Sequence, residues 1–373
     1  MTDGDTSEQR GVFLATASAT SLERQVALAI AVAALALFIA VVPFVRTPLV
    51  ALPAFIPAYE ASLFFIDLVT AVLLFDQFAR LRSLGVLVLA AGYLFDALII
   101  IPHALSFPGA FAPGGLLGAR EQTTAWLYVF WHGGFPLFVI GYALLRRREA
   151  GKVRRAGAAI AAAVVAVALL VVALTLVATW GHDWLPVVMQ QGDYSLLVRK
   201  GISPAVWLVT LAAMAALWGR DQRVVDLWLM LVMWVWLFDI ALSAVLGANR
   251  FDLGFYVGRI FGLIAAGFLL ATLVVEMARI HAGALRAAAS AEQRLAQLAR
   301  LRGQPEQGPR RGEPTDAFIQ RQNIAHYRSL LESGTLDEAQ YRAIEKLLAE
   351  EEGKARDGDA PNPATGAGRN PAD

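Results

Sequence analysis

The chain contains no cysteine, and this absence excludes several kinds of chemistry. Without thiols there are no disulfide bonds, no thiolate metal sites and no iron–sulfur clusters. Charge is also scarce, because Asp, Glu, Lys and Arg make up only 17% of the 373 residues and the formal net charge is +1. Such a balance gives no electrostatic reason to expect nucleic acid as a partner. The chain is instead rich in apolar side chains, at 57% of its residues.

The apolar residues are gathered into runs of about 20, which is the length that crosses a bilayer as a helix. The runs do not alternate strictly between apolar and polar residues, so they predict helical spans and not barrel strands. We therefore predict an all-α fold, a polytopic membrane bundle of eight transmembrane helices plus a small cytoplasmic helical hairpin. The eight predicted spans are residues 26–45, 58–78, 83–103, 122–145, 157–180, 202–219, 223–246 and 253–278.

The remaining segments have a different composition. The first apolar run is not followed by a small-residue cleavage site, so we expect it to stay as a span. After residue 280 an Ala/Leu-rich helix gives way to a Gly/Pro linker and two amphipathic helices, which together bury too little to be stable alone. The predicted segments are a cytoplasmic N-terminal segment (1–24), an eight-span sensor domain (25–280), a helical extension (281–302), a linker (303–314), a helical hairpin (315–351) and a disordered tail (352–373).

Positive charge fixes the expected orientation. The loops 79–82, 146–156 and 220–223 hold ten Lys and Arg residues, whereas the alternate loops hold five. By the positive-inside tendency the first set and both termini face the cytoplasm. The Ala- and Arg-rich composition is typical of a bacterial protein, so we expect a multi-pass protein of the bacterial cytoplasmic (inner) membrane.

The second predicted span, AYEASLFFIDLVTAVLLFDQ, contains Glu60, Asp67 and Asp76. A charged side chain in hydrocarbon costs about 2.5–3.5 kcal/mol on insertion scales, so such residues usually have a function or a partner. Asp76 lies four residues before Arg80, and a local ion pair is the better interpretation there. Glu60 and Asp67 share one helix face seven residues apart.

Polar residues of other spans fall at matching depths, which predicts a polar ligand pocket in the outer half of the bundle. At 1.5 Å per residue, one group lies near the outer ends and a second group about two turns deeper. The predicted ligand-binding residues are Glu60, Asp67, Asp96, His103, Gln122, Trp126, His132, Asp239 and Arg259. Two structural alternatives remain open. Asp239 and Arg259 can pair with each other and pin two spans together, and a lone carboxylate can be kept neutral by burial.

Three stretches within residues 57–145 carry a resemblance to a known family. They read PAYEASLFFIDLVTAVLLFDQ, GYLFDALIIIPHALSFPGAF and GLLGAREQTTAWLYVFWHGGFPLFVIGYALL. These stretches resemble the fourth membrane-associated sensor family, whose members are bacterial input modules usually followed by a diguanylate cyclase or a histidine kinase. This chain departs from that pattern, because it has no GGDEF sequence and no P-loop. By this resemblance, the residues within the family's shared motifs are Glu60, Asp67, His103, Gln122, Trp126 and His132.

These features favour a non-enzymatic sensory protein that binds an unknown small ligand from the outer side. It would signal through its cytoplasmic tail, either to a separate partner or as a homodimer. A proton-coupled transporter also has buried carboxylates, but we see no internal repeat in the sequence. A metal or haem protein would use His103 and His132 as ligands, although their depths differ and there is no HExxH motif. The sequence names no cofactor.

Overall fold

The described part of the chain is helical, as predicted. The computed structural model describes residues 19–52, 54–146, 153, 155–190, 193–219, 223–247, 249–302, 314–334 and 336–358. It forms two compact units, Met1–Leu285 and Arg286–Asp373. Within the described ranges there are no strands, and the only extended pairings are isolated bridges.

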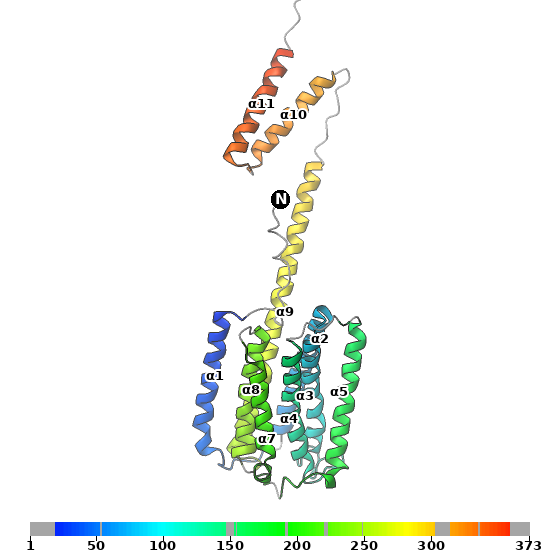
Figure 1. Cartoon of the computed structure of the whole chain (residues 1–373), viewed down its shortest axis with the longest axis vertical. Coiled ribbons are helices and arrows are strands. Elements are labelled where there is room, and N and C mark those ends of the chain that lie inside the picture. The colour runs from blue at the N-terminus through cyan, green and yellow to red at the C-terminus, as the bar shows by residue number, and fades with distance from the viewer. Residues whose placement is uncertain are drawn as a thin grey trace, which may run out of the picture. The chain divides into compact units, whose positions relative to one another are not determined.

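The first unit is a bundle of long apolar helices (Figure 1). Seven helices of the described residues are long and apolar enough to cross a membrane, which confirms the predicted polytopic class. The long helices are α1 (Ser21–Val41), α2 (Phe55–Leu81), α3 (Leu84–Ser106), α4 (Thr123–Leu145), α5 (Ala156–Thr179), α7 (Ile202–Leu217), α8 (Val224–Ile240) and α9 (Leu253–Arg302). Short segments between them are η1 (Val42–Phe44), η2 (His182–Trp184), α6 (Leu196–Arg199) and the π-helical η3 (Ala241–Leu246), which continues α8.

The predicted span 202–219 is shorter in the structure than expected. Helix α7 has 16 residues, and its length of about 24 Å falls short of the roughly 30 Å of a hydrocarbon core. The chain nevertheless passes between the two ends of the bundle here. Tyr194 donates to the Asn249 carbonyl at one end, whereas the Leu217 carbonyl accepts from Arg146 at the other. The start of α1 and the outgoing part of α9 therefore lie at the same end of the bundle (Figure 1).

The longer connections come together at one end, which we call the loop end. Leu49 N–H donates to the Phe251 carbonyl at 3.0 Å, and Leu253 N–H donates to the Thr47 carbonyl at 2.9 Å. Gln122 receives the N–H groups of Val188 and Met189 on its Oε1 at 2.6 and 2.8 Å. Hydrogen bonds therefore connect the segments of the loop end to one another. The loop end consists of residues 45–52, 107–122, 180–190, 193–201, 247 and 249–252.

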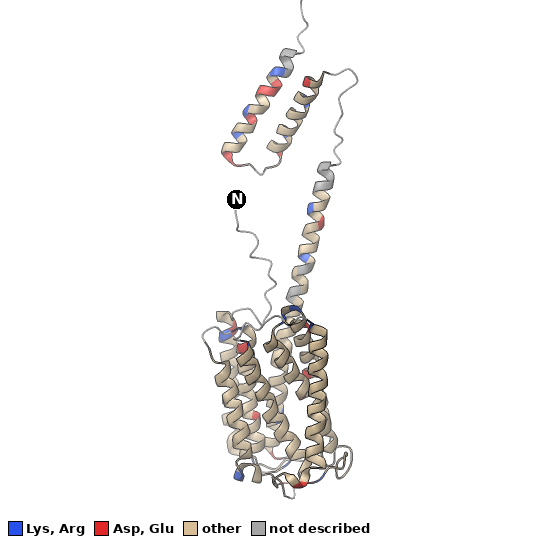
Figure 2. Cartoon of the chain, turned by 45° about the vertical axis from the view of Figure 1, so that its right-hand side comes forward, with Lys and Arg blue, Asp and Glu red and all other residues tan. Residues whose placement is uncertain are grey.

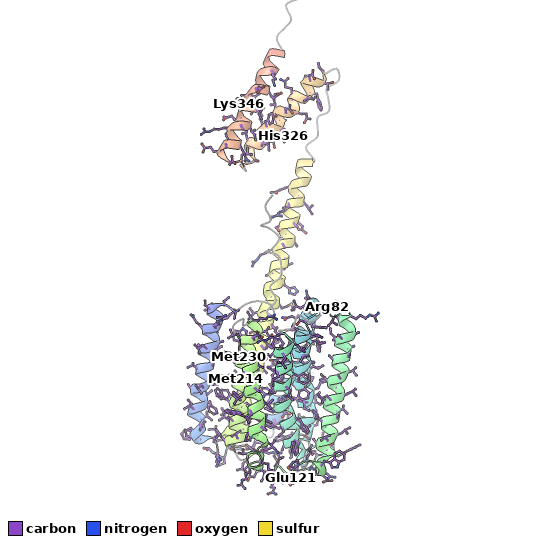
Figure 3. The ribbon with its side chains drawn as sticks, in the orientation of Figure 1. Arg82, Glu121, Met214, Met230, His326 and Lys346 are labelled. Carbon is purple, nitrogen blue, oxygen red and sulfur yellow. The ribbon has the colours of Figure 1, made fainter. Side chains whose placement is uncertain are left out.

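The opposite end of the bundle, which we call the basic end, carries Arg82 and Arg146. Figure 3 shows Arg82 and Glu121 at opposite ends of the bundle, as the alternating direction of the helices requires. Charged residues are sparse along the bundle ribbons and lie mostly toward their ends, and they are denser on α11 (Figure 2). The predicted local pair is present, because Arg80 Nε lies 3.0 Å from Asp76 Oδ2.

A buried ion pair joins three helices at the basic end. Arg146 pairs with Asp226 on α8 and donates to the Leu217 carbonyl of α7 at 3.0 Å. The Tyr142 hydroxyl donates to Asp226 Oδ1 at 2.7 Å. The side chain of Asp226 is fully buried, so its charge depends on these partners rather than on water. This cluster was not among the predictions from the sequence.

The second unit contains two packed helices, α10 (Thr315–Glu332) and α11 (Glu338–Gly358). Gln320 donates to the Glu351 carbonyl at 2.9 Å, and Arg328 pairs with Glu352 at 2.6 Å. No described residue of α10 is fully buried. Helix α11 extends past the expected boundary at residue 351, so residues 352–358 are helical and not part of a disordered tail. Of the expected N-terminal segment (1–24), linker (303–314) and tail (352–373), residues 1–18, 303–313 and 359–373 lie outside the described residues.

We expect Asp226→Asn to destabilise the bundle by about 3 kcal/mol, because it leaves the buried Arg146 guanidinium without its counter-charge. Asp76→Asn is the matched control, since it breaks the exposed Asp76–Arg80 pair and should leave stability close to that of the wild type. Unfolding of the detergent-purified protein would be followed by circular dichroism. Equal effects of the two substitutions would contradict a stabilising role for the buried pair.

Candidate functional site

All nine residues predicted to bind ligand are buried in the bundle, each with 8% or less of its surface exposed. The structure brings most of them into contact with one another, but not as the walls of one cavity. They instead form two histidine–carboxylate pairs, one pair of carboxyls, and separate contacts to the loop end.

Each histidine is paired with a carboxylate from another helix. His103 Nδ1 lies 2.7 Å from Glu60 Oε1, and His132 Nε2 lies 3.1 Å from Asp239 Oδ2. His132 Nδ1 lies 3.0 Å from the Tyr128 carbonyl, which can only accept, so Nδ1 must carry a proton. The Nε2–Oδ2 contact then holds one further proton, on either atom. In both arrangements the His132–Asp239 pair has no net charge.

Trp131 joins the two pairs. Its ring centroid lies 5.8 Å from that of His103 and 4.7 Å from that of His132. The indole Nε1 also approaches Asp96, without the geometry of a regular hydrogen bond. We call this connected group the Trp131 network. Its members are Glu60, His103, Trp131, His132 and Asp239.

Asp67 and Asp96 face each other across α2 and α3, close enough to interact electrostatically. Their exposed fractions are 3% and 1%, and the nearby Tyr93 hydroxyl and Asp96 Oδ1 have no hydrogen-bond partner among the described residues. Two charges of the same sign repel each other where neither is exposed to water, so having both carboxylates ionised would be unfavourable here. This pair lies apart from the pocket described next.

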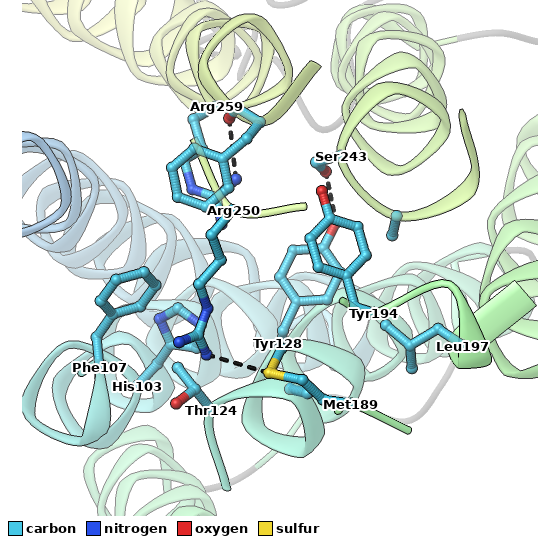
Figure 4. A pocket seen from close by; sticks show the side chains of 13 residues that line it. His103, Phe107, Thr124, Tyr128, Met189, Tyr194, Leu197, Ser243, Arg250 and Arg259 are labelled. Atoms are coloured by element: carbon cyan, nitrogen blue, oxygen red, sulfur yellow. Dashed lines mark hydrogen bonds between the residues drawn. The ribbon is translucent and has the colours of Figure 1, made fainter. Parts of the chain in front are cut away.

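A pocket opens between the loop end and the helices beneath it (Figure 4). The space between its walls is about 410 Å³, part of which is open to solvent. Of the nine predicted residues, only His103 and Arg259 line it. The full lining is His103, Phe107, Thr124, Ala125, Tyr128, Met189, Tyr194, Leu197, Ser243, Ala244, Arg250, Phe255 and Arg259.

Tyr128 and Ser243 connect this pocket to the Trp131 network. The Tyr128 ring stacks on His132 with centroids 3.7 Å apart, and its hydroxyl lies 2.9 Å from Ser243 Oγ. Ser243 Oγ in turn lies 2.6 Å from the Asp239 carbonyl and 3.0 Å from Asp239 Oδ1. Ser243 belongs to η3, and π-helical turns of this kind are frequent at functional sites. Direct contacts therefore connect the pocket to Asp239.

The alternative pairing of Asp239 with Arg259 is not what the structure has. Asp239 pairs with His132, while Arg259 Nη1 donates to the Phe255 carbonyl at 2.9 Å. The Arg259 guanidinium lies 3.6 Å from the centroid of the Phe255 ring, in a cation–π contact. With these two contacts to Phe255, Arg259 lies on the pocket wall.

Gln122 and Trp126 position the loop end instead of lining the pocket. Besides the two N–H groups that its Oε1 accepts, Gln122 donates through Nε2 to the Met189 carbonyl. Trp126 Nε1 donates to the Pro186 carbonyl at 3.1 Å. These bonds hold the segment that brings Met189 to the pocket wall.

Glycines of α9 allow that helix to pack closely on its neighbours, and two of them lie against Asp239. Gly254, Gly258 and Gly262 follow at intervals of four residues, the spacing that brings membrane helices together. A Cβ at Gly258 would lie 3.0 Å from Asp239 Oδ1, and one at Gly262 would lie 2.8 Å from the Tyr59 hydroxyl. The four-residue spacing is visible in the sequence, and it is the signal that could have identified this contact.

A second cavity lies between α3, α4, α5 and α7, and its space of about 1050 Å³ includes the part outside its open mouth. Its lining includes Phe95, Phe130, Phe138 and the glycines Gly133 and Gly134, and its other lining residues are Val or Leu. It offers no side-chain hydrogen-bonding group that could orient a polar ligand. Among the described residues, no group of three His, Asp or Glu side chains is placed to hold a metal ion.

A family model described as "Membrane-associated sensor, integral membrane domain" (MASE4) matches residues 50–281. The chain belongs to this family. The MASE4 match covers helices α2 to α8 and most of the bundle part of α9, and so contains the pocket and the Trp131 network. It confirms the resemblance seen in the sequence and makes the protein a multi-pass membrane protein of a sensor family. No curated protein and no solved structure matches the chain.

We expect Gly262→Ala and Gly258→Ala to destabilise the bundle by about 1–3 kcal/mol each, because the added methyl groups overpack the contact between α9 and Asp239. Gly267→Ala is the control on the same helix, where an added Cβ meets nothing within 4 Å. Thermal unfolding in detergent would measure the difference. A loss as large for Gly267→Ala would show that helix α9 tolerates no added methyl group and that the Asp239 contact is not special.

Proposed function

We propose that this protein is a sensory receptor whose loop-end pocket binds a small ligand on the outer side of the bacterial cytoplasmic membrane. The observation that carries the proposal is the unbroken set of contacts from the pocket to α9. Tyr128 and Ser243 reach from the pocket wall to Asp239, against which Gly258 of α9 packs. Helix α9 then continues to Arg302, beyond the last residue of the bundle unit.

The signal in this proposal is a shift between two packings of α8 and α9. A ligand that pulls Tyr128 away from Ser243 would disturb the hydrogen bonds at Asp239. Helix α9 meets Asp239 through glycines, with no side chain between them. A small displacement of Asp239 would therefore act directly on the α9 backbone, because no flexible side chain lies between them to change its conformation instead. Asp67 and Asp96, which do not line the pocket, would set the stability of the two packings.

The packing between the two polar clusters favours a receptor over a transporter. The loop-end network reaches inward to His132 on α4, and the basic-end cluster begins at Tyr142. Along α4 between them lie Phe135 and Val139, both fully buried, and Met233 of α8 is equally buried. A polar solute would have to cross this apolar layer, whereas a conformational signal would not.

The output is proposed to leave through α10 and α11, by binding a cytoplasmic partner or a second copy of the chain. Ile319, Tyr341 and Leu347 expose 50%, 45% and 44% of their surfaces. Two helices with so little buried apolar surface gain stability by covering these side chains.

The orientation and the open pocket are tested together by cysteine accessibility, for which the cysteine-free chain is a clean background. In intact cells, we expect a membrane-impermeant methanethiosulfonate to label Ala244→Cys in the pocket wall but not Leu22→Cys at the start of α1. The reverse pattern would place the pocket on the cytoplasmic side and contradict the proposed orientation.

Removing residues 314–373 should leave the bundle folded with an unchanged thermal unfolding temperature, because α10 and α11 form a separate unit. If these helices bind a second copy, light scattering should show the full chain as a larger oligomer than the truncated one. If they bind another protein, the two forms should have the same size, and only the full chain should retain a cytoplasmic protein through crosslinking in cells. A truncated protein that keeps both its oligomeric state and its crosslinked partners would exclude the proposed role.

A further inference from the structure

The charges on the wall of the loop-end pocket have one sign. Among the described residues that line it, Arg250 and Arg259 are cationic and none is Asp or Glu. Arg250 comes from the loop before α9, and its guanidinium lies 4.8 Å from the centroid of the Phe107 ring. Its Nη2 lies 3.4 Å from Met189 Sδ, a weak acceptor (Figure 4).

Three buried acidic side chains near the pocket have other partners. Asp239 pairs with His132, and Glu60 pairs with His103. Asp252 accepts the Phe255 N–H on Oδ1 at 2.7 Å and the Asn249 N–H on Oδ2 at 3.3 Å. The described residues include no ion pair for Arg250 or for Arg259. Glu121 acts electrostatically on Arg250 but does not line the pocket, so the charged groups on the pocket wall itself are all positive.

The two guanidinium groups act on each other across this space. Burial lowers the pKa of Arg250 to about 10, and the like charge of Arg259 contributes to the same change. Arg250 stays protonated at neutral pH, so the repulsion is present when the pocket is empty. An anion between the two groups would relieve the repulsion and accept charge-assisted hydrogen bonds from both.

The remaining wall is aromatic and apolar, with Phe107, Tyr194, Leu197 and Phe255 around the arginines. His103 adds a hydrogen-bonding group, since Glu60 occupies Nδ1 and leaves Nε2 without a partner among the described residues. Resting on the ligand pocket proposed above, we infer that the ligand is a small organic anion whose carboxylate or phosphate group binds between Arg250 and Arg259. Its organic part packs on the aromatic side chains.

The test uses Ala244→Cys in the full chain, reconstituted in phosphatidylcholine nanodiscs that expose both faces of the membrane. The labelling rates of this cysteine with an anionic and a cationic methanethiosulfonate are compared as a ratio. Any change in thiol ionisation cancels in this ratio. We expect the anionic-to-cationic ratio to exceed that of the exposed Leu49→Cys at the same end by about tenfold. Arg250→Gln and Arg259→Gln should each lower the ratio, and Arg199→Gln, at an exposed arginine of the loop end, should not.

Protection against the neutral reagent N-ethylmaleimide identifies the kind of anion, at constant ionic strength. Benzoate or inorganic phosphate should slow labelling of Ala244→Cys, and benzamide, the uncharged analogue of benzoate, should not. Protection by phosphatidylglycerol in the nanodisc, without added solute, would assign the anion to a lipid headgroup instead of a free ligand. Either source supports the inference if protection weakens about tenfold in the two arginine variants.

Equal protection by benzamide and benzoate would overturn the inference, as would a labelling ratio that matches Leu49→Cys. Both comparisons are made with the arginines intact, so they decide the question even if an arginine variant fails to fold. A cysteine that no reagent reaches in the nanodisc also overturns it, because the pocket is then closed to ligands. The labelling of Ala244→Cys in intact cells separately decides whether the proposed outward orientation holds. A pocket that is labelled from outside but shows no charge preference leaves that orientation standing without the anion.

Discussion

A polar side chain inside a membrane-spanning bundle has no water to form hydrogen bonds with, and leaving it without a partner costs several kcal/mol of free energy. The structure meets this constraint in layers. At the loop end, Glu60 pairs with His103 and Asp239 with His132, and at the basic end Asp226 pairs with Arg146. Phe135 and Val139, both fully buried, separate these two levels along α4. The helices are therefore held in register by polar pairs at two levels, while dispersion and close packing supply the rest of the contact.

The same constraint explains why the site suits a sensor. A buried pair without net charge, such as His132–Asp239, can change its proton position or its hydrogen bonds at little electrostatic cost. Tyr128 stacks on one member of this pair and Ser243 bonds to the other, so the pair is sensitive to the pocket above it. The glycines of α9 lie against Asp239 on its other side. In the proposed receptor, such a site would respond to its ligand by a change in packing.

The pocket itself departs from the usual balance of charges in a membrane protein. Most buried arginines are paired with carboxylates, yet Arg250 and Arg259 rest on aromatic rings and weak or backbone acceptors. Such an arrangement costs stability in the empty state. In the proposed site the ligand supplies the missing negative charge. The free energy that the unpaired arginines cost the folded protein would then be recovered when the ligand binds.

The sequence by itself determined the class of the protein and the depth of its polar residues. Runs of about 20 apolar residues have one stable solution in a bilayer, and the one-dimensional rise of a helix places Glu60 above Asp67 without any tertiary information. The local pair of Asp76 and Arg80 follows for the same reason. Lateral neighbours were decided only by the tertiary structure, because rotation of a helix about its axis and the choice of adjacent helices depend on packing of the whole bundle. This is why Asp239 meets His132 and not Arg259, and why Arg250, a loop residue in the sequence, reaches the pocket.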